Sequence, residues 1–318
     1  MIVVMGATGA TGSALLHRLT ALGEPTRALS REPERLRAAL DGAGRDGAGR
    51  DNAAPSRTEV VGADAADPDS LRAAFRGASQ LFLTMANGPA QVALETNAIA
   101  AAAASGIGHV VKLSAPGAGG PDSPVAIARG HHAIEVALRE SGMRHTVLRP
   151  YAFMQKLLLL APGVAAGGVV AGATADAACN YIDCRDIADV AAAALTRPEI
   201  AGHAYTLTGD RTYRHTQLTD LLTGLLERPV RYVDLPGPEL HRHLTTTARM
   251  PDWLAAHVVE IQRMATTHPE APDGTVARVL GRPPRTLEAF LREHLDLFRL
   301  RPGTDDGPAH PARPAHLP

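Results

Sequence analysis

The first 150 residues alternate short apolar segments with segments of helical periodicity, and this alternation restricts the possible folds more than any other feature. The predicted strands are Ile2–Met5, Thr26–Leu29, Thr58–Val61, Gln80–Thr84, His109–Leu113 and Thr146–Leu148. The predicted helices between them are Ser13–Leu22, Pro33–Leu40, a helix opened by Asp67 and Pro68, Ala90–Ala104 and Ala126–Ser141. Strands joined by helices run parallel and are covered on both faces. The pattern therefore predicts an α/β fold with a doubly wound parallel sheet.

After residue 150 the alternation becomes less regular. The predicted elements there are the strands Ala204–Leu207 and Val230–Val233 and the helices Ala188–Leu195, His215–Leu226, Leu240–Ala248, Pro251–Thr266 and Arg285–Leu297. We expect the organisation of the chain to change near this point.

Two segments lie outside both patterns. Residues 41–56 contain a tandem repeat with the letters DGAGR and show no apolar periodicity. A phosphate-binding loop needs a strand before it and a helix after it, so we interpret this segment as a flexible insertion. Residues 301–318 contain five prolines and little apolar content, which predicts a disordered tail.

A glycine-rich turn joins the first predicted strand to the first predicted helix. It reads Gly6-Ala-Thr-Gly-Ala-Thr-Gly12, with the spacing G-x-x-G-x-x-G. Glycine permits a sharp turn and lets a pyrophosphate approach the backbone, while the helix N-terminus offers free N–H groups and a partial positive charge. Because a strand precedes the turn and a helix follows it, we predict a dinucleotide site that contains Gly6, Thr8, Gly9, Ala10, Thr11 and Gly12.

The end of the second predicted strand indicates which dinucleotide is bound. NAD-specific sites place Asp or Glu there, to hold the ribose 2′-hydroxyl. This chain has Ser30-Arg31 at that place, and an arginine binds a 2′-phosphate through charge-assisted hydrogen bonds. We therefore expect NADPH as the cofactor. Glu32 follows directly, so NADH stays open as an alternative.

The charge composition excludes several classes of partner. The 318 residues include 32 basic and 33 acidic side chains, with a net charge of -1, so no basic field attracts nucleic acid or an anionic membrane. Only two of the basic residues are lysines, Lys112 and Lys156. Any chemistry that requires a lysine therefore has two candidates, and Lys112 is expected within the strand before Ser114.

The sequence indicates a cytoplasmic protein without a membrane segment. The N-terminus lacks a basic region and reaches glycine at residue 6, unlike a signal peptide. Leu157–Ala175 is uncharged but contains Pro162 and four glycines, which argues against a bilayer span. Cys179 and Cys184 are expected to be reduced thiols, and no metal site is predicted. We expect a monomer or homodimer that binds a small-molecule substrate.

Several motifs resemble, in the same order, those of one protein family. They are Gly6–Gly9, Arg27–Glu34, Gly62–Pro68, Val111–Ala115, His131–Glu135, Thr146–Pro150 with Phe153, Tyr181–Ala188 and Gly281–Phe290. Over about residues 1–298, apart from the insertion, the chain resembles the NmrA-like branch of the atypical short-chain dehydrogenases/reductases. Within that branch it is similar to the bacterial NAD(P)H:quinone reductases and triphenylmethane reductases.

The resemblance implies a Rossmann-type fold with a small, mainly helical C-terminal substrate subdomain. Residues 1–150 would form the dinucleotide-binding core, and residues 151–300 would contain the remaining, interleaved Rossmann elements and the substrate cleft. Besides the glycine motif, the cofactor would contact Arg31 at its 2′-phosphate, Asp64 near the adenine, Thr84 and Met85 near the ribose, and Pro150 and Phe153 near the nicotinamide.

The chain departs from the wider family pattern at the catalytic residues. Most short-chain dehydrogenases use Tyr-x-x-x-Lys, in which the tyrosine donates a proton. No tyrosine here has a lysine four residues on, and the equivalent register is Ile127-x-x-x-His131. His131 can form hydrogen bonds or take part in acid–base chemistry near neutral pH. Ser114, beyond the fifth predicted strand, is the second catalytic candidate.

These observations lead to three hypotheses about function. The first is an NAD(P)H-dependent reductase that transfers hydride to a conjugated acceptor, such as a quinone or an aromatic intermediate of natural-product biosynthesis. Such acceptors have less need of a proton donor, because hydride addition gives a stabilised anion. The second hypothesis is a regulator that binds NAD(P) without turnover, and the third is a non-redox biosynthetic enzyme on the same fold.

Overall fold

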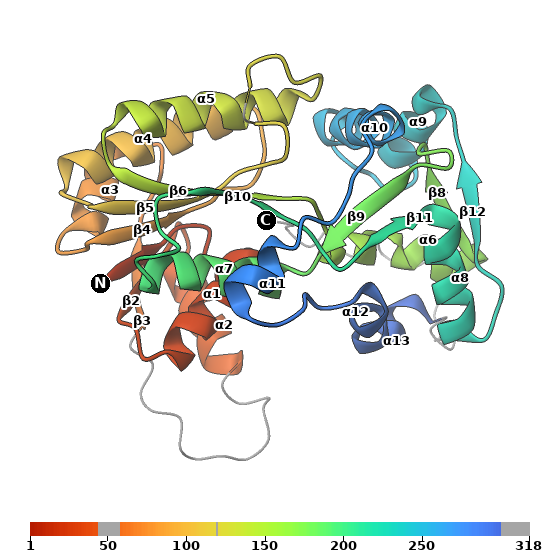
Figure 1. Ribbon diagram of the computed structural model, residues 1–318, viewed down its shortest axis with the longest axis horizontal. Helices are drawn as coiled ribbons and strands as arrows, with labels where there is room; N and C mark the ends of the chain where they lie inside the picture. Colours follow the sequence, from red (N-terminus) through yellow and green to blue (C-terminus); the bar gives the residue numbers. More distant parts are fainter. Residues whose placement is uncertain (44–57, 119, 300–318) are drawn as a thin grey trace.

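The computed structural model describes residues 1–43, 58–118 and 120–299. The strands of its main sheet are β1 (Ile2–Val4), β2 (Thr26–Ser30), β3 (Thr58–Gly62), β4 (Gln80–Leu83), β5 (His109–Leu113), β6 (Arg144–Pro150) and β10 (Ala204–Leu207). They lie in the order β10-β6-β5-β4-β1-β2-β3 (Figure 1). All neighbouring strands of this sheet are parallel, which confirms the predicted Rossmann-type α/β fold.

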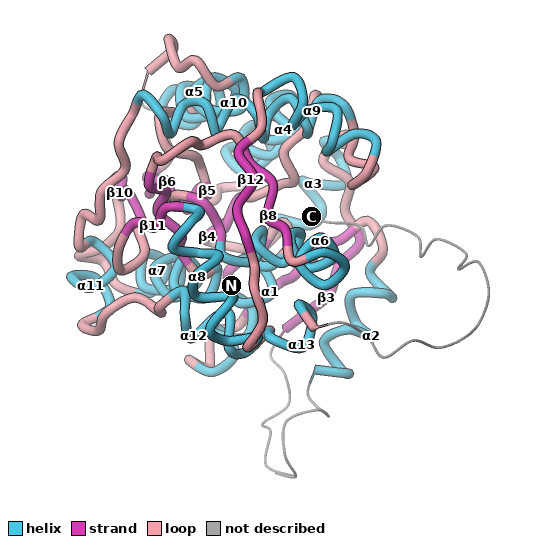
Figure 2. The backbone as a smooth tube through the Cα atoms, turned by 90° about the vertical axis from the view of Figure 1, so that its right-hand side faces the viewer, coloured by secondary structure: helices cyan, strands magenta, loops and turns pink. Residues whose placement is uncertain are grey.

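Helices cover both faces of this sheet (Figures 1 and 2). One face carries α1 (Ala10–Ala21), α2 (Pro33–Ala43), α7 (Cys184–Thr196) and α11 (Thr275–Leu280), and the other carries α3 (Pro68–Phe75), α4 (Gln91–Ala104) and α5 (Ala126–Glu140). The start of α3 is as predicted, because the Asp67 carboxylate accepts hydrogen bonds from the amides of Asp69 and Ser70 and Pro68 opens the helix.

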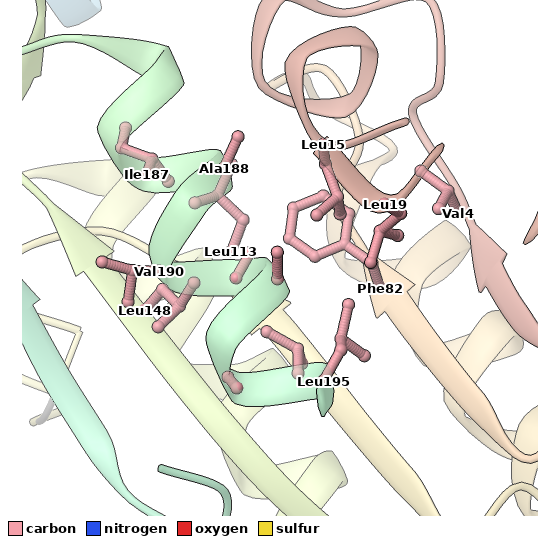
Figure 3. Close-up of a cluster of buried hydrophobic side chains, with 14 of the residues drawn as sticks. Val4, Leu15, Leu19, Phe82, Leu113, Leu148, Ile187, Ala188, Val190 and Leu195 are labelled. Atoms are coloured by element: carbon pink, nitrogen blue, oxygen red, sulfur yellow. The ribbon is translucent and has the colours of Figure 1, made fainter. Parts of the chain in front are cut away.

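Apolar clusters on the two faces fix the helices to the sheet. On one face, Leu15 and Leu19 of α1 share a cluster with Ile187 of α7 and with Phe82 and Leu148 of the sheet (Figure 3). All five side chains are fully buried, and burial of one such side chain stabilises the fold by about 1.5–3 kcal/mol. A second cluster lies beneath α3, α4 and α5.

The remaining elements form a smaller body beside the main sheet (Figure 1). They are β7 (Ala152–Phe153), the 3-10 helix η1 (Met154–Leu160), α6 (Ala161–Gly167), β8 (Val169–Gly172), β9 (Ala178–Ile182), β11 (Thr212–Arg214), α8 (His215–Leu226), β12 (Arg231–Asp234), α9 (Gly237–Thr246), α10 (Asp252–Thr267), α12 (Leu287–Glu293) and α13 (Leu295–Phe298). Two small sheets, β11-β9-β7 and β12-β8, lie within it. Since β10, α7 and α11 come from the same half of the chain but join the main sheet, the two bodies are interleaved in sequence.

The structure corrects several expectations about element boundaries. Residues 41–43 belong to the last turn of α2 and not to the insertion, because the helix continues into the first repeat. The helix expected over Arg285–Leu297 is divided into α12 and α13. The elements absent from the sequence prediction are β7, η1, α6, β8, β9, β11 and α11. Residues 44–56 and 301–318, expected to be flexible, lie outside the described residues.

The uncharged segment Leu157–Ala175 is divided among η1, α6 and β8. Within the described part of the chain, no helix is long and apolar enough to cross a membrane.

Candidate active site

The carboxyl ends of the parallel strands bring the predicted cofactor residues to one edge of the main sheet. Gly6 follows β1, Arg31 follows β2, Asp64 follows β3, Thr84 follows β4 and Ser114 follows β5. β1 lies between β2 and β4, so the strand order reverses direction there. In open α/β sheets, ligands bind in the crevice at such a switch point.

Two glycines make the turn before α1 compact. Gly6 has a φ of +69°, in the left-handed region that favours glycine. A Cβ atom at Gly6 would lie 2.7 Å from the carbonyl oxygen of Thr84, and one at Gly12 would collide with the carbonyl oxygen of Gly6. The turn, α1 and the end of β4 therefore approach one another more closely than side chains would allow.

The first turn of α1 contains hydrogen-bond donors that have no acceptor. Gly9 is the N-cap residue and offers no side chain to the helix. Among the described residues, the amides of Ala10, Thr11 and Gly12 have no acceptor. The Thr11 hydroxyl is also buried without an oxygen or nitrogen partner in the described chain. A phosphate group fits this set of donors.

Arg31 lies just after β2 and is exposed. Its acidic neighbour Glu32 pairs instead with Arg35, at 3.3 Å between Oε2 and Nη1. No carboxylate of the described residues pairs with Arg31, so its guanidinium is available to an anionic ligand, such as the 2′-phosphate expected from the sequence.

The residues expected near the adenine and the ribose lie at the ends of β3 and β4. Asp64 is exposed, and its Oδ1 accepts a hydrogen bond from Ala66 N at 2.9 Å, which supports the turn before α3. Thr84 lies directly against the glycine turn through Gly6, and Met85 packs against the cluster beneath α3 and α4. Thr84 and Met85 are therefore nearer to the switch point than Asp64.

Ser114 belongs to a hydrogen-bonded group with Glu135 and Arg149. The Ser114 hydroxyl donates to Glu135 Oε1 at 2.6 Å, and Arg149 Nη2 donates to Glu135 Oε2 at 2.5 Å. Ser114 and Glu135 are both buried. The Glu135 carboxylate therefore connects β5, α5 and β6 to one another.

A second polar group lies between β5, α4 and α5. Lys112 of β5 and Glu95 of α4 are fully buried and form an ion pair, with 2.8 Å between Nζ and Oε2. Lys112 Nζ also donates to the carbonyl oxygen of Leu113 and lies 3.3 Å from Nδ1 of His131. Gln91 donates to Glu95 Oε1 at 2.9 Å. The ammonium group thus has a buried counter-charge at Glu95 and hydrogen-bond contacts with Leu113 and His131, whereas Glu95 Oε2 has no hydrogen-bond partner among the described residues.

His131 is buried, and its imidazole is neutral near pH 7. Burial, followed by the charges of Lys112 and His257, lowers its pKa well below 6.5. Lys112 Nζ, 3.3 Å from Nδ1, and Gln91 Nε2, 3.4 Å from the ring Nε2, are both donors. Because a neutral imidazole accepts at one nitrogen only, one of these two contacts is a hydrogen bond to the ring. His131 can therefore form hydrogen bonds but is not an imidazolium acid at neutral pH.

The sequence did not predict that the Lys112 ammonium would contact His131, the residue at the lysine position of the Tyr-x-x-x-Lys pattern. One signal for it was present, because a lysine inside an apolar strand needs a buried acceptor or a carboxylate. Glu95 gave no such signal, since α4 is rich in alanine and its periodicity does not show which face is buried.

The segment after β6 connects the main sheet to the smaller body. Pro150 is the last residue of β6, and Phe153 lies in β7, which pairs in parallel with β9. Gln155 then donates to Asp183 Oδ1 at 3.0 Å and accepts a hydrogen bond from Cys184 N at 3.0 Å. The start of η1 is therefore attached to the N-terminus of α7.

The two cysteines, Cys179 and Cys184, are separate buried thiols. Burial raises the pKa of each to about 12, so neither is a thiolate at neutral pH and neither offers a nucleophile. Within residues 1–43, 58–118 and 120–299, no three His, Cys, Asp or Glu side chains form a group that could hold a metal ion.

Comparisons with known proteins agree with this fold. The model of the NmrA-like family matches residues 1–291. The chain is 36% identical over 298 residues to the (4-alkanoyl-5-oxo-2,5-dihydrofuran-3-yl)methyl phosphate reductase of Streptomyces griseus, a match that covers 94% of this chain and 99% of that protein. It is 32% identical over 301 residues to the NAD(P)H azoreductase of Xenophilus azovorans, again covering 94% and 99%.

The structure is also similar to a solved one. The NADPH-dependent quinone oxidoreductase of Escherichia coli, complexed with NADPH, has a TM-score of 0.82 and 26% sequence identity, over 93% of this chain and 100% of that chain. The sheet order, the glycine turn and the match along most of the sequence lead to one conclusion: this chain belongs to the NmrA-like family.

Proposed function

We propose that this protein is an NADPH-dependent reductase that transfers hydride to a conjugated, electrophilic small molecule. The observation that carries the proposal is the set of amides without acceptors in the first turn of α1, at the switch point of the sheet. Arg31, which pairs with no carboxylate of the described residues, adds a cation at the end of β2. The two curated relatives are reductases by name, and the quinone oxidoreductase is complexed with NADPH.

When bound, NADPH supplies the hydride. The contribution of this chain is to bind and orient that cofactor. The amides of Ala10, Thr11 and Gly12 would hold the pyrophosphate, and Arg31 would hold the 2′-phosphate. Arg31 is also the residue that makes NADPH preferable to NADH, because it replaces the acid expected in an NAD-specific site.

Three further contacts follow the order of the strands along the same edge. Thr84 and Met85, after β4, would lie beside the ribose, and Asp64, after β3, beside the adenine. Pro150 and Phe153, where the chain leaves β6, would border the nicotinamide. This arrangement places the reacting ring next to the connection between the main sheet and the smaller body, which would supply the substrate side of the cleft.

The two catalytic candidates act in this proposal through hydrogen bonds. His131 is neutral and buried, with Nδ1 facing Lys112 and Nε2 facing Gln91. The Ser114 hydroxyl gives its hydrogen to Glu135 and keeps an oxygen that accepts. Neither is a general acid at neutral pH, so water would protonate the product after hydride transfer. The suitable acceptors are those whose reduced form is a stabilised anion, such as quinones, azo compounds and unsaturated lactones.

An absorbance assay tests this proposal. The purified protein is mixed with NADPH and a panel of quinones, azo dyes and phosphorylated unsaturated lactones, and the nicotinamide band is followed. We expect at least one of these classes to oxidise NADPH, and we expect the oxidation of NADPH to be faster than that of NADH. Binding of NADPH without oxidation across the whole panel would refute the reductase and favour a cofactor-binding regulator.

An Arg31→Ala variant tests the choice of cofactor. A hydrogen bond to a charged group contributes about 1.5–3 kcal/mol, and Arg31 is exposed, so we expect the dissociation constant of NADPH to rise about tenfold. The dissociation constant of NADH, which lacks the 2′-phosphate, should stay the same. Equal losses for both nucleotides would contradict the role of Arg31.

A further inference from the structure

A groove runs along α1 and α7, on the side of α1 that does not face the core. Leu15, Leu16 and Leu19 point from α1 into the core, and the groove uses the other side of the same helix. Its walls come from α1, α7, the end of α11 and the segment that joins α11 to α12 (Figure 1). Its volume is about 720 Å³, and small-molecule sites have volumes of about 300–1,000 Å³.

Arginine dominates the charged lining of this groove. One carboxylate, Asp189, lines it together with five arginines, which are Arg18, Arg185, Arg197, Arg282 and Arg285. Another cavity of similar size, between α8 and α12, is lined by three acidic residues and two arginines. The excess of positive charge therefore distinguishes the groove beside α1 and α7.

The carboxylates that balance three of these arginines lie beneath them. Asp186 is fully buried, and Asp189 is 17% exposed. Arg282 contacts both carboxylates, at 2.8 Å and 2.6 Å. Arg285 also contacts both, and Arg18 lies 3.4 Å from Asp189. Since the three arginine side chains are 32%, 37% and 45% exposed, a ligand that enters the groove meets guanidinium groups before it meets carboxylates.

The other two arginines lie at the two ends of α7. At the start of the helix, Arg185 binds Asp183 at 2.6 Å and Glu293 at 2.8 Å. At the end of the helix, Arg197 is exposed and donates to the carbonyl oxygen of Val279, and it pairs with no carboxylate of the described residues. Together with the pairs above, five arginines are balanced by four carboxylates, so one positive charge of the groove has no counter-charge.

Several N–H groups of these arginines are available to a ligand. Within the described residues, Nη1 and Nη2 of Arg18 have no acceptor, and its only ion pair is through Nε. Arg285 contacts the carboxylates through Nη1, and no described residue accepts from its Nη2. Three small apolar side chains, Ala14, Ala192 and Ala193, also line the groove. The groove therefore combines charged donors with an apolar surface.

We propose that this groove is a second ligand site, which binds a small molecule with a phosphate group and a compact apolar body. A phosphate has several oxygens, so it can accept hydrogen bonds from more than one guanidinium group, and guanidinium groups bind phosphate through paired hydrogen bonds. Arg18 and Arg285 would hold the phosphate, and the alanines would contact the apolar body. The inference goes beyond the proposed function and does not depend on it, because the groove lies along α1 and the proposed cofactor site lies at its N-terminus.

Calorimetric titration with phenyl phosphate tests this site, because the probe joins a phosphate group to a small apolar ring. The full-length protein is titrated with and without an excess of NADPH. We expect a dissociation constant of about 1 mM or lower, with the same value in both conditions, because the two sites are separate. Phenol, which has the ring but lacks the phosphate, should not bind.

An Arg18→Met variant removes one guanidinium group from the groove and keeps an apolar stem. Asp189 retains Arg282 and Arg285 as partners, so no carboxylate loses its only counter-charge and the urea midpoint should stay close to that of the wild type. The dissociation constant of phenyl phosphate should rise about tenfold, because a charge-assisted hydrogen bond is lost. Arg139→Met is the matched control. It removes an exposed arginine from the last turn of α5, on the other face of the sheet, and should leave the constant unchanged.

Four results would overturn the inference. The first is that phenyl phosphate does not bind to the wild-type protein, and the second is an unchanged constant in Arg18→Met. The third is a loss of binding in the presence of NADPH, which would place the phosphate in the cofactor site. The fourth is an equal loss in Arg18→Met and Arg139→Met, which would show that net charge alone attracts the probe. The oxidation assay with NADPH decides the proposed function separately.

Discussion

The buried pair of Lys112 and Glu95 permits a quantitative test of how this site is stabilised. Both side chains are fully buried, and the ion pair measures 2.8 Å. In a Glu95→Gln variant, the shape of the side chain is kept, and its amide oxygen can still accept the hydrogen bond from Gln91. The variant removes the negative charge that balances the Lys112 ammonium.

The expected loss can be bounded from two directions. Removing one partner of a buried ion pair costs about 3–5 kcal/mol. The protein can limit this loss by releasing the proton of Lys112, and to deprotonate an ordinary lysine at pH 7 costs about 4.6 kcal/mol, at about 1.36 kcal/mol per pH unit. We therefore expect a decrease of about 3–5 kcal/mol in the free energy of unfolding, which is a large part of the about 5–15 kcal/mol that typical proteins have.

A double variant separates the charge from other effects of the substitution. Glu95→Gln combined with Lys112→Met removes both charges and leaves apolar atoms in place of the ammonium. Replacement of a whole buried ion pair by apolar groups is often close to neutral. The double variant should therefore be more stable than Glu95→Gln alone, although the His131 ring loses its donor at Nδ1.

Urea denaturation followed by circular dichroism measures these free energies by linear extrapolation, and the cycle of variants gives the coupling between the two residues. The exposed pair of Glu288 and Arg292, at 2.6 Å, is the matched control. Glu288→Gln should cost less than about 1 kcal/mol. A similarly small loss in Glu95→Gln, or a double variant no more stable than that single variant, would refute the reasoning.

Two further outcomes concern pH and the glycine turn. Burial lowers the pKa of both His109 and His215 to about 4. Below pH 6.5 the unfolded state therefore binds more protons than the folded state. Each histidine then removes up to about 1.4 kcal/mol of stability per pH unit as the pH falls toward 4. Burial raises the pKa of Glu270 to about 7, so between pH 7 and 4.5 its proton binds to the folded state first and acts in the opposite direction. Burial also lowers the pKa of His131 and His257, which act in the same direction. Because these histidines outweigh one glutamate, the urea midpoint should fall between pH 6.5 and pH 5, and a constant midpoint would contradict this balance. Gly12→Ala places a methyl group against the Gly6 carbonyl oxygen, and fluorescence titration should show at least about a tenfold loss of NADPH affinity; unchanged affinity would show that the turn tolerates a side chain.

The regular part of this fold could be predicted because its signals are local. The predicted ranges of β5, β10 and α8 coincide with the observed ones. Each is an apolar or amphipathic run between turn-forming residues, and its own period identifies it. The glycine turn could be predicted equally well, since Gly6–Gly12 lies between a strand and a helix that are both recognisable in the sequence.

The smaller body gave weaker signals because its elements depend on distant partners. β7 has two residues and forms only by pairing with β9, and β8 pairs with β12 about sixty residues later in the sequence. No period can be read from such short segments, and tertiary contacts decide their conformation. The position of Gln155 belongs to the same class of information, because it depends on hydrogen bonds between η1 and the N-terminus of α7.

In the proposed function, the buried ion pair accounts for a preference for acceptors that need no acid. In most short-chain dehydrogenases, the tyrosine and lysine of Tyr-x-x-x-Lys form the proton-donating pair. In this chain His131 stands at the lysine position, and the ammonium group beside it belongs to Lys112 of β5. Glu95 neutralises that charge, and His131 beside it is neutral. The ion pair has no net charge, and His131, whose pKa is lowered by burial, is not an imidazolium acid at neutral pH. Their contribution is to fix α4 and α5 to β5, which leaves hydride transfer to depend on how well the acceptor stabilises the resulting anion.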